Sequence, residues 1–196
     1  MNRYNIKKFI NCVLFFAKKT NPKKLGILKL NKLLYYIDFE HYKKYGRPIL
    51  GDIYIRMSQG PVPSFSYNLF NIAFKNDGNG MTTASKTLKD VVVVKQERVG
   101  DYSINAIYPK KDKIFDRTLF SKSELQIMEK IASKYKNKTG TSISRETHKV
   151  DTPWSKTPEM QPIDYNLILD KDSISKEYID FWREQEKELD SSLVSK

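Results

Sequence analysis

The stretch that decides the fold covers residues 29–70 and reads KLNKLLYYIDFEHYKKYGRPILGDIYIRMSQGPVPSFSYNLF. It begins as an amphipathic helix with doubled tyrosines and breaks at YGRP, residues 45–48, where Gly46 is a plausible terminator and Pro48 follows closely. Residues 52–57 then alternate in the manner of a strand with one buried face. The GPV motif at residues 60–62 predicts the start of another helix.

Two helices are expected before this break. Residues 5–19 carry apolar side chains at spacings of three and four, and Asn21-Pro22 ends that helix. The second helix is expected over residues 25–45, with an inner side made of Leu30, Leu33, Leu34, Ile37 and His41. Three lysines on it are predicted to face outward, namely Lys29, Lys32 and Lys43. Because Tyr36, Phe39 and Tyr42 widen the apolar arc, this helix is predicted to be central.

The rest of the chain predicts a mixed fold. The helix after GPV is expected to bury Phe65, Leu69, Ile72 and Ala73, and residues 77–80 form a loop by composition. Residues 91–95 and 102–108 predict two strands that join 52–57 in one small antiparallel sheet. A capping box at Ser121 and Glu124 opens a helix through residue 136, and residues 142–149 form a short helix that ends at His148. Residues 162–169 are a helical turn or an extended arm, and residues 175–189 are a charged helix. The predicted class is therefore α+β, mostly α-helical, with a helical core around a central helix and a small antiparallel sheet or hairpin.

Composition sets limits on the class of protein. The 196 residues are 39% hydrophobic, which is ample for a packed core, and no apolar run approaches the roughly 20 residues that cross a bilayer. One cysteine, Cys12, allows no internal disulfide framework and indicates a reducing compartment, so we expect a cytoplasmic protein with no membrane partner. The net charge of +12 leaves two interpretations open: a nucleic-acid surface, or a solvated Lys-rich surface that attracts an acidic protein. The low share of arginine favours the second.

Catalytic and metal motifs are missing from the sequence. There is no nucleophile elbow, Walker loop or dinucleotide fingerprint. Cys12, His41 and His148 have no metal-site spacing, and the acid pair Asp38 and Glu40 has the spacing of a solvated helix face. We therefore predict no enzyme, no metal and no cofactor. An unfamiliar enzyme would have only His148 and Glu146 as candidates.

Aromatic residues offer three interpretations. Tyr35, Tyr36, Tyr42 and Tyr45 form a packed core or shell, a protein-binding patch or a base-stacking platform, and packing is favoured. Trp154 either plugs the core behind Pro153 or contributes to a recognition surface.

Four separated motifs carry a resemblance to a known family. They are KLNKLLY at residues 29–35, YGRPI at 45–49, GPV at 60–62, and the helix end at His148 followed by Pro153-Trp154. In order and spacing they resemble the Panacea domain, also called the antitoxin SocA-like domain, of bacterial and phage toxin–antitoxin pairs. The resemblance covers roughly residues 5–170 and departs from the family at Ser58-Gln59, where relatives often carry an aromatic.

The resemblance implies an antitoxin that neutralises a co-encoded protein toxin by direct binding, without catalysis. One branch of the family is similar to a proteolytic adaptor that delivers its toxin to a Clp-type protease. The alternative function is a basic, nucleic-acid-binding transcriptional regulator. The expected domain covers residues 1–170, and residues 171–196 form a charged C-terminal extension.

Two groups of site residues follow from these arguments. The predicted partner-binding residues are Tyr35, Tyr36, Phe39, Tyr42, Arg47, Tyr67 and Trp154. The residues expected to hold the fold as family motif positions are Lys29, Leu33, Tyr35, Gly46, Pro48, Gly60, Pro61, Val62, His148 and Trp154.

Overall fold

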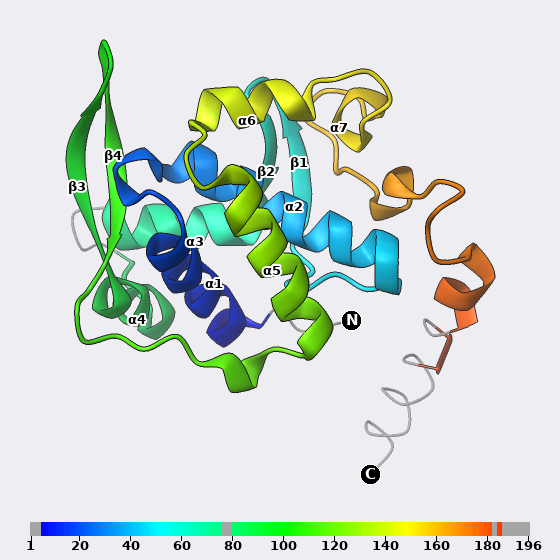
Figure 1. Ribbon diagram of the computed structural model, residues 1–196, viewed down its shortest axis with the longest axis horizontal. Helices are drawn as coiled ribbons and strands as arrows, with labels where there is room; N and C mark the ends of the chain where they lie inside the picture. The colour runs from blue at the N-terminus through cyan, green and yellow to red at the C-terminus, as the bar shows by residue number, and fades with distance from the viewer. Residues whose placement is uncertain (1–4, 76–79, 182–183, 186–196) are drawn as a thin grey trace.

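Helix α2 (Ile27–Tyr45) lies at the centre of the molecule in the computed structural model, which describes residues 5–75, 80–181 and 184–185 (Figure 1). Helices α1 (Ile6–Lys19), α5 (Lys122–Tyr135) and α6 (Gly140–Thr147) all pack against it. Asn5 caps the start of α1 by accepting a hydrogen bond from the Lys8 amide at 3.0 Å. Gly46 ends α2 with a φ of 74°, in the left-handed conformation that glycine adopts most easily. The predicted central helix is therefore present, and a short 3₁₀ turn (Pro22–Lys24) precedes it.

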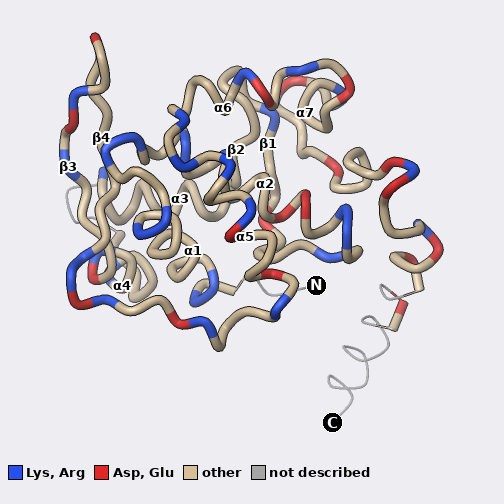
Figure 2. Tube along the Cα trace, in the orientation of Figure 1, with Lys and Arg blue, Asp and Glu red and all other residues tan. Residues whose placement is uncertain are grey.

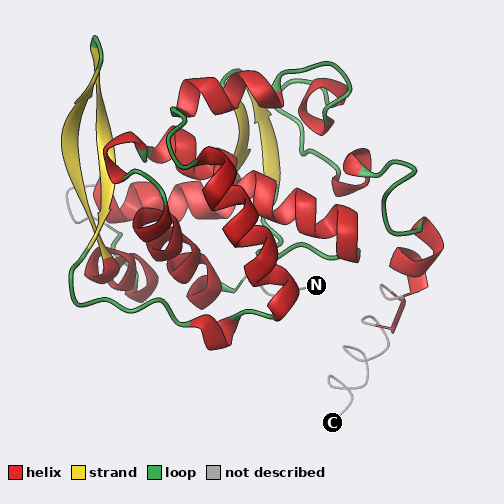
Figure 3. Ribbon diagram, viewed as in Figure 1, coloured by secondary structure: helices red, strands yellow, loops and turns green. Residues whose placement is uncertain are grey.

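The other elements lie around this core. They are β1 (Tyr54–Met57), β2 (Gly60–Pro63), α3 (Ser64–Phe74), α4 (Thr83–Val91), β3 (Val92–Val99), β4 (Tyr102–Pro109), a 3₁₀ turn η2 (Arg117–Leu119), α7 (Pro153–Lys156) and a 3₁₀ turn η3 (Tyr165–Ile168). The prediction of a mostly helical α+β fold is confirmed (Figure 3). The sequence argument did not include α4, which the Thr82 capping box opens.

The strands form two separate antiparallel pairs within the described residues, so the prediction of one joint sheet is wrong. The β3–β4 pair is a long hairpin in which Val92 faces Pro109 and Val99 faces Tyr102, and it projects from the helical body (Figure 3). The β1–β2 pair has Tyr54 opposite Pro63 and Met57 opposite Gly60. The β1–β2 pair packs against α2 and α6, apart from the long hairpin (Figure 1).

The GPV motif is a strand, which corrects the predicted helix start at residue 60. Gly60 has a φ of 100° at the end of a tight turn, and Pro61 pairs with Arg56. Proline is tolerated because both members of a two-stranded sheet are edge strands. Helix α3 begins only at Ser64, and its Phe65, predicted to lie inside, is 42% exposed.

On β1 the buried face is the one that carries Tyr54, which is 1% exposed, whereas Ile53 is 60% exposed. The outer edge of β1 is covered by residues 160–163, because Ile163 N–H donates to Tyr54 O at 2.7 Å. The segment 162–169 thus begins as an extended arm and ends in the turn η3, which combines the two predicted alternatives.

The chain after η3 returns to the end of α2. The Ile174 amide donates to Lys43 O at 3.0 Å, and Ile179, 1% exposed, lies against Gly46. Residues 176–181 are helical, as predicted, while residues 182–183, which include Trp182, and residues 186–189 of the predicted helix lie outside the described residues. The predicted loop 77–80 is also outside them except for Gly80. No helix in the described ranges combines the length and the hydropathy of a membrane span.

Candidate partner-binding site

A buried carboxylate, Asp38, organises the corner between α2 and β1. Its two oxygens accept hydrogen bonds from the backbone amides of residues 49, 50 and 51 at 3.0, 2.7 and 3.1 Å. The hydroxyls of Tyr54 and Tyr165 donate to it at 3.0 and 3.1 Å. Burial raises the pKa of Asp38 to about 6, against the effect of the hydrogen bonds from Leu50, Tyr54 and Tyr165. The residue is 0% exposed, so its predicted place on a solvated helix face is wrong.

A second buried carboxylate, Asp52, fixes the start of α3. It accepts from the amides of Phe65 and Ser66 at 3.0 and 2.9 Å and from the Ser66 hydroxyl at 2.6 Å. These amides belong to the first turn of α3, whose N-cap, Pro63, makes no side-chain hydrogen bond. Asp52 therefore supplies the cap from outside the helix, where a negative charge also complements the helix dipole.

Three of the predicted partner-binding residues are buried. Tyr35, Phe39 and Tyr42 are 3%, 1% and 2% exposed. Phe39 stacks on Tyr165 at 4.4 Å between ring centroids and lies 4.3 Å from Tyr35. These side chains connect α2 to β1 and η3. They are packed inside this fold, as the favoured interpretation of the sequence expected.

The other predicted partner-binding residues reach the surface to different degrees. Tyr36 is half-buried and stacks on Tyr135 at 5.0 Å. Tyr67 is half-buried on α3. Arg47 is exposed and lines a polar cleft of about 550 Å³ that also contains the ion pair between Lys8 and Glu124, 2.6 Å apart. The prediction that these three contact a partner stays a prediction.

Lys32 is buried under the β1–β2 turn rather than turned outward. It is 0% exposed, and its ammonium donates to Pro61 O at 2.8 Å. Burial lowers its pKa to about 7. A Cβ on Gly60 would lie 2.5 Å from Lys32 Cε and 2.8 Å from Thr147 Oγ1, so the turn has room only for glycine. The motif glycine and the lysine therefore fit each other.

Lys29, also predicted to face outward, is 1% exposed and closes the end of α5. Its ammonium donates to Lys136 O at 3.1 Å, and Lys24 donates to Asn137 O at 3.1 Å. Cations at these carbonyls complement the negative end of the α5 dipole. Burial, with a smaller effect of the Lys24 charge, lowers the pKa of Lys29 to about 8.

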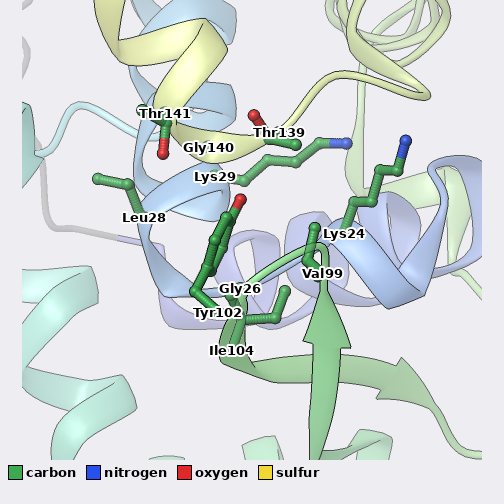
Figure 4. A pocket seen from close by; sticks show the side chains of 10 residues that line it. All are labelled: Lys24, Gly26, Leu28, Lys29, Val99, Tyr102, Ile104, Thr139, Gly140 and Thr141. Atoms are coloured by element: carbon green, nitrogen blue, oxygen red, sulfur yellow. The ribbon is translucent and has the colours of Figure 1, made fainter.

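A small cavity lies beside Lys29, between the starts of α2 and α6 and the tip of the β3–β4 hairpin. Figure 4 shows its lining, with the Tyr102 ring between Leu28 and Gly26 and the ends of Lys24 and Lys29 on the same side. Its volume of about 50 Å³ has room for one or two waters. Organic ligands occupy pockets of roughly 300–1,000 Å³, so this cavity is a packing gap between elements.

His148 and Trp154 form a stacked pair beside the β1–β2 turn. Their ring centroids are 3.9 Å apart with an interplanar angle of 17°. The Trp154 indole N–H donates to Met57 O at 3.0 Å, and Arg56 lies over the indole with its Cζ 4.5 Å from the ring centroid. All three side chains are half-buried. Trp154 therefore holds the β1–β2 turn and is still partly exposed. Its contribution to a recognition surface stays a prediction.

The remaining family motif residues are buried or half-buried and contribute to packing. Leu33 is 0% exposed in the main core, and Pro61 is buried, whereas Pro48 and Val62 are half-buried. The structure brings Gly60, Pro61 and His148 together around Lys32 and leaves Lys29 at a separate site. The sequence argument missed the roles of Lys32, Asp38, Asp52 and Arg56. One signal existed, because Leu30, Leu34 and Asp38 are four residues apart on one face of α2.

The other residues considered for chemistry are buried in the core or make hydrogen bonds. Cys12 is 0% exposed in the core. His41 is 0% exposed, with Nδ1 bonded to Arg47 O at 2.6 Å and Nε2 to the Ser123 hydroxyl at 3.1 Å. Glu146 accepts from the Tyr135 hydroxyl at 3.0 Å. In the part of the chain that the structure describes, no three His, Cys, Asp or Glu residues gather as a metal site would require.

A comparison with protein families gives one match. The family model described as antitoxin SocA-like, Panacea domain matches residues 30–155, more than half of the chain. The matched region runs from the start of α2 to α7 and contains Lys32, Asp38, Gly60, His148 and Trp154. Comparisons with curated proteins and with solved structures give no match.

Proposed function

Because the chain belongs to the antitoxin SocA-like, Panacea domain family, we propose that it neutralises a co-encoded protein toxin by binding it directly. The family match carries this proposal. The buried carboxylates and lysines support it, since they serve to fix a rigid scaffold. A preformed surface loses little conformational entropy on association.

Inhibition would come from covering the toxin's working surface. A specific, stable complex buries about 1,600 Å² in total, of which half lies on each partner. An antitoxin of this kind acts stoichiometrically and has no turnover. We place its action in the cytoplasm, where its partner would be synthesised.

The test uses the product of an open reading frame next to the gene. When that product is expressed alone, growth should stop, and co-expression of this chain at an equal or higher level should restore it. The two purified proteins should elute as one complex in size-exclusion chromatography. Equal killing with and without this chain would reject the proposal.

A narrower version adds a protease. An adaptor would shorten the toxin's half-life in cells that contain a Clp-type protease and would fail to protect cells that lack it. A direct inhibitor protects both strains equally. Pulse–chase measurement of the toxin in the two strains separates these mechanisms.

The second candidate is a nucleic-acid-binding regulator, which the net charge of +12 favours. Lysines and arginines are spread over most elements and alternate with acidic residues (Figure 2), so they do not gather on one element. Gel shifts on the chain's own promoter at about 50 and 200 mM salt decide the matter, because affinity that depends on phosphate contacts falls steeply with salt. Binding that keeps a promoter preference at the higher salt would favour the regulator.

A further inference from the structure

Four side chains meet at the β1–β2 turn, from α2, β1, the C-terminal end of α6 and α7. We call them the basic–aromatic cluster: Lys32, Arg56, His148 and Trp154. Arg56 lies over the Trp154 indole at 4.5 Å, and His148 stacks on the same indole at 3.9 Å. Lys32 lies beneath Gly60, next to Thr147. The Lys32 and Arg56 charges lower the pKa of His148, after the larger effect of burial. Both cations thus lie within electrostatic range of His148.

The cluster has more hydrogen-bond donors than the chain uses. Arg56 Nε and His148 Nε2 are buried and have no hydrogen-bond partner. The Lys32 ammonium has three N–H groups, and its one hydrogen bond goes to Pro61 O. None of the ion pairs among the described residues includes Lys32, Arg56 or His148. Buried donors without acceptors are costly, and a guanidinium fork fits a carboxylate better than any other protein group.

We propose that the basic–aromatic cluster receives one carboxylate from an acidic side chain of the partner protein. The Arg56 guanidinium donates to the carboxylate oxygens, the Trp154 and His148 rings form the wall of the site, and Lys32 adds positive potential from behind the turn. The proposal rests on the proposed function, because it names the chemistry by which the partner is held. It also predicts that the toxin's contact surface carries an Asp or Glu at its centre.

A protein carboxylate suits this cluster better than a nucleic-acid backbone. Lys32 is 0% exposed, and the other three side chains are half-buried, so the cluster presents no row of exposed cations. Nucleic acids are bound by rows of exposed cations that neutralise several phosphates. Arginine and tryptophan together, partly desolvated and held by neighbours, are the combination that dominates the affinity of protein interfaces.

The first experiment needs no toxin. In a Trp182→Phe background only one of the two tryptophans remains, so its indole N–H signal in a ¹⁵N NMR spectrum reports on Trp154. N-acetylglutamate should shift that signal saturably, whereas the uncharged N-acetylglutamine should not. Arg56→Gln should abolish the shift. Arg117→Gln, which removes an exposed arginine at η2, should leave it unchanged.

Three results of the N-acetylglutamate titration would each overturn the proposal. They are a saturable shift that survives Arg56→Gln, the same shift with N-acetylglutamine, and no saturable shift at tens of millimolar N-acetylglutamate. Inorganic phosphate and an oligo-dT strand are titrated in parallel. If either binds through Arg56 more tightly than the carboxylate does, the cluster is a phosphate site and the protein-carboxylate assignment is wrong.

The second experiment uses the full chain and the neighbouring gene product. Arg56→Gln should weaken their complex on the order of 30-fold, the scale of one interface hot spot, and Arg56→Lys should recover part of the loss because it keeps the charge without the fork. Circular dichroism checks that each variant is folded. If wild type binds the toxin and Arg56→Gln binds it equally, the carboxylate inference fails and the antitoxin function stands. If wild type does not bind at all, the proposed function fails, and the NMR titration alone decides the cluster.

Discussion

Gly60 shows at the level of one residue why a motif position allows no substitution. Its φ of 100° is strained for any side chain, and a Cβ would also meet Lys32 Cε at 2.5 Å and Thr147 Oγ1 at 2.8 Å. We expect Gly60→Ala to lower the free energy of unfolding by about 2 kcal/mol or more. Urea unfolding measures it. Gly100→Ala is the matched control, because Gly100 has a φ of 64° and no atom within 4 Å, so its loss reflects backbone conformation alone. Equal losses of stability at the two positions would contradict the claim that the space beside Lys32 requires glycine at position 60.

Lys32 makes stability depend on pH in a definite direction. Its pKa in the folded protein is about 7, against 10.5 for the free side chain, so between these values the unfolded chain binds more protons than the folded one. Stability therefore rises as the pH is raised from 7 towards 9. Lys29, with a pKa of about 8, acts in the same direction.

Unfolding by urea at pH 7, 8 and 9 checks this dependence. We expect the wild-type free energy of unfolding to increase over this range and Lys32→Met to flatten the increase, leaving the part due to Lys29. Lys18→Met, at an exposed position on α1, should retain the wild-type slope. A Lys32→Met slope as steep as that of the wild type would show that Lys32 is not the titrating group.

Asp38 is the residue on which the corner after α2 depends. It accepts hydrogen bonds from three backbone amides and two tyrosine hydroxyls. In Asp38→Asn an NH₂ group replaces one oxygen and would face these donors, so we expect a loss of about 2–4 kcal/mol in the free energy of unfolding. Glu40→Gln makes the same chemical change on the same helix at a half-buried surface pair with Lys130 and should cost under about 1 kcal/mol. Similar losses for the two variants would mean that the Asp38 hydrogen bonds make no net contribution to the free energy of unfolding.

At the scale of elements, the sequence predicted correctly the helix ends that depend on neighbouring residues alone. Helix α5 begins at its capping box, where Ser121 and Glu124 exchange hydrogen bonds at 3.3 and 2.8 Å. Ser121→Ala should lower the free energy of unfolding by about 1 kcal/mol in thermal or urea denaturation. Ser133→Ala, at an exposed position inside the same helix, should be neutral or slightly stabilising. An unchanged midpoint for Ser121→Ala would contradict the cap.

Elements that depend on distant contacts were predicted less well. The β3–β4 hairpin and the Gly46 terminator follow from local turn chemistry, and both are present. The GPV strand was taken for a helix start because proline is also common at the first position of a helix. The contact that holds it as a strand over α2 is the hydrogen bond from Lys32 to Pro61 O, between residues far apart in the sequence. The outward orientation assigned to Lys29 and Lys32 failed for the same reason, since the carbonyls that bind them belong to Lys136 and Pro61.

The residues of the candidate site also fall into those that the sequence indicated and those that it did not. Trp154 and His148 were singled out from the sequence, and the structure stacks them. Arg56 completes the basic–aromatic cluster, but the sequence did not indicate it. A polar residue that alternates with apolar ones is ordinary for a strand with one exposed face. Tyr35, Phe39 and Tyr42 were named as candidate partner contacts although packing was the favoured interpretation, and the structure buries all three. A periodic pattern cannot assign aromatics to one face of a helix that is contacted on more than one side.

At the scale of the whole molecule, the division at residue 170 can be tested by truncation. Residues after 170 contact α2 through Ile174 and through Ile179, which is 1% exposed against Gly46. A chain that ends at residue 170 should still fold, because the matched region ends at residue 155 and the main core lies before it. It should lose about 1.5–3 kcal/mol for the Ile179 contact, a loss that Ile179→Ala in the full chain should approach. Thermal unfolding and toxin binding are measured on both. Because the basic–aromatic cluster is untouched, binding should persist in the truncated chain, and a truncated chain that does not fold would make residues 171–196 part of the domain.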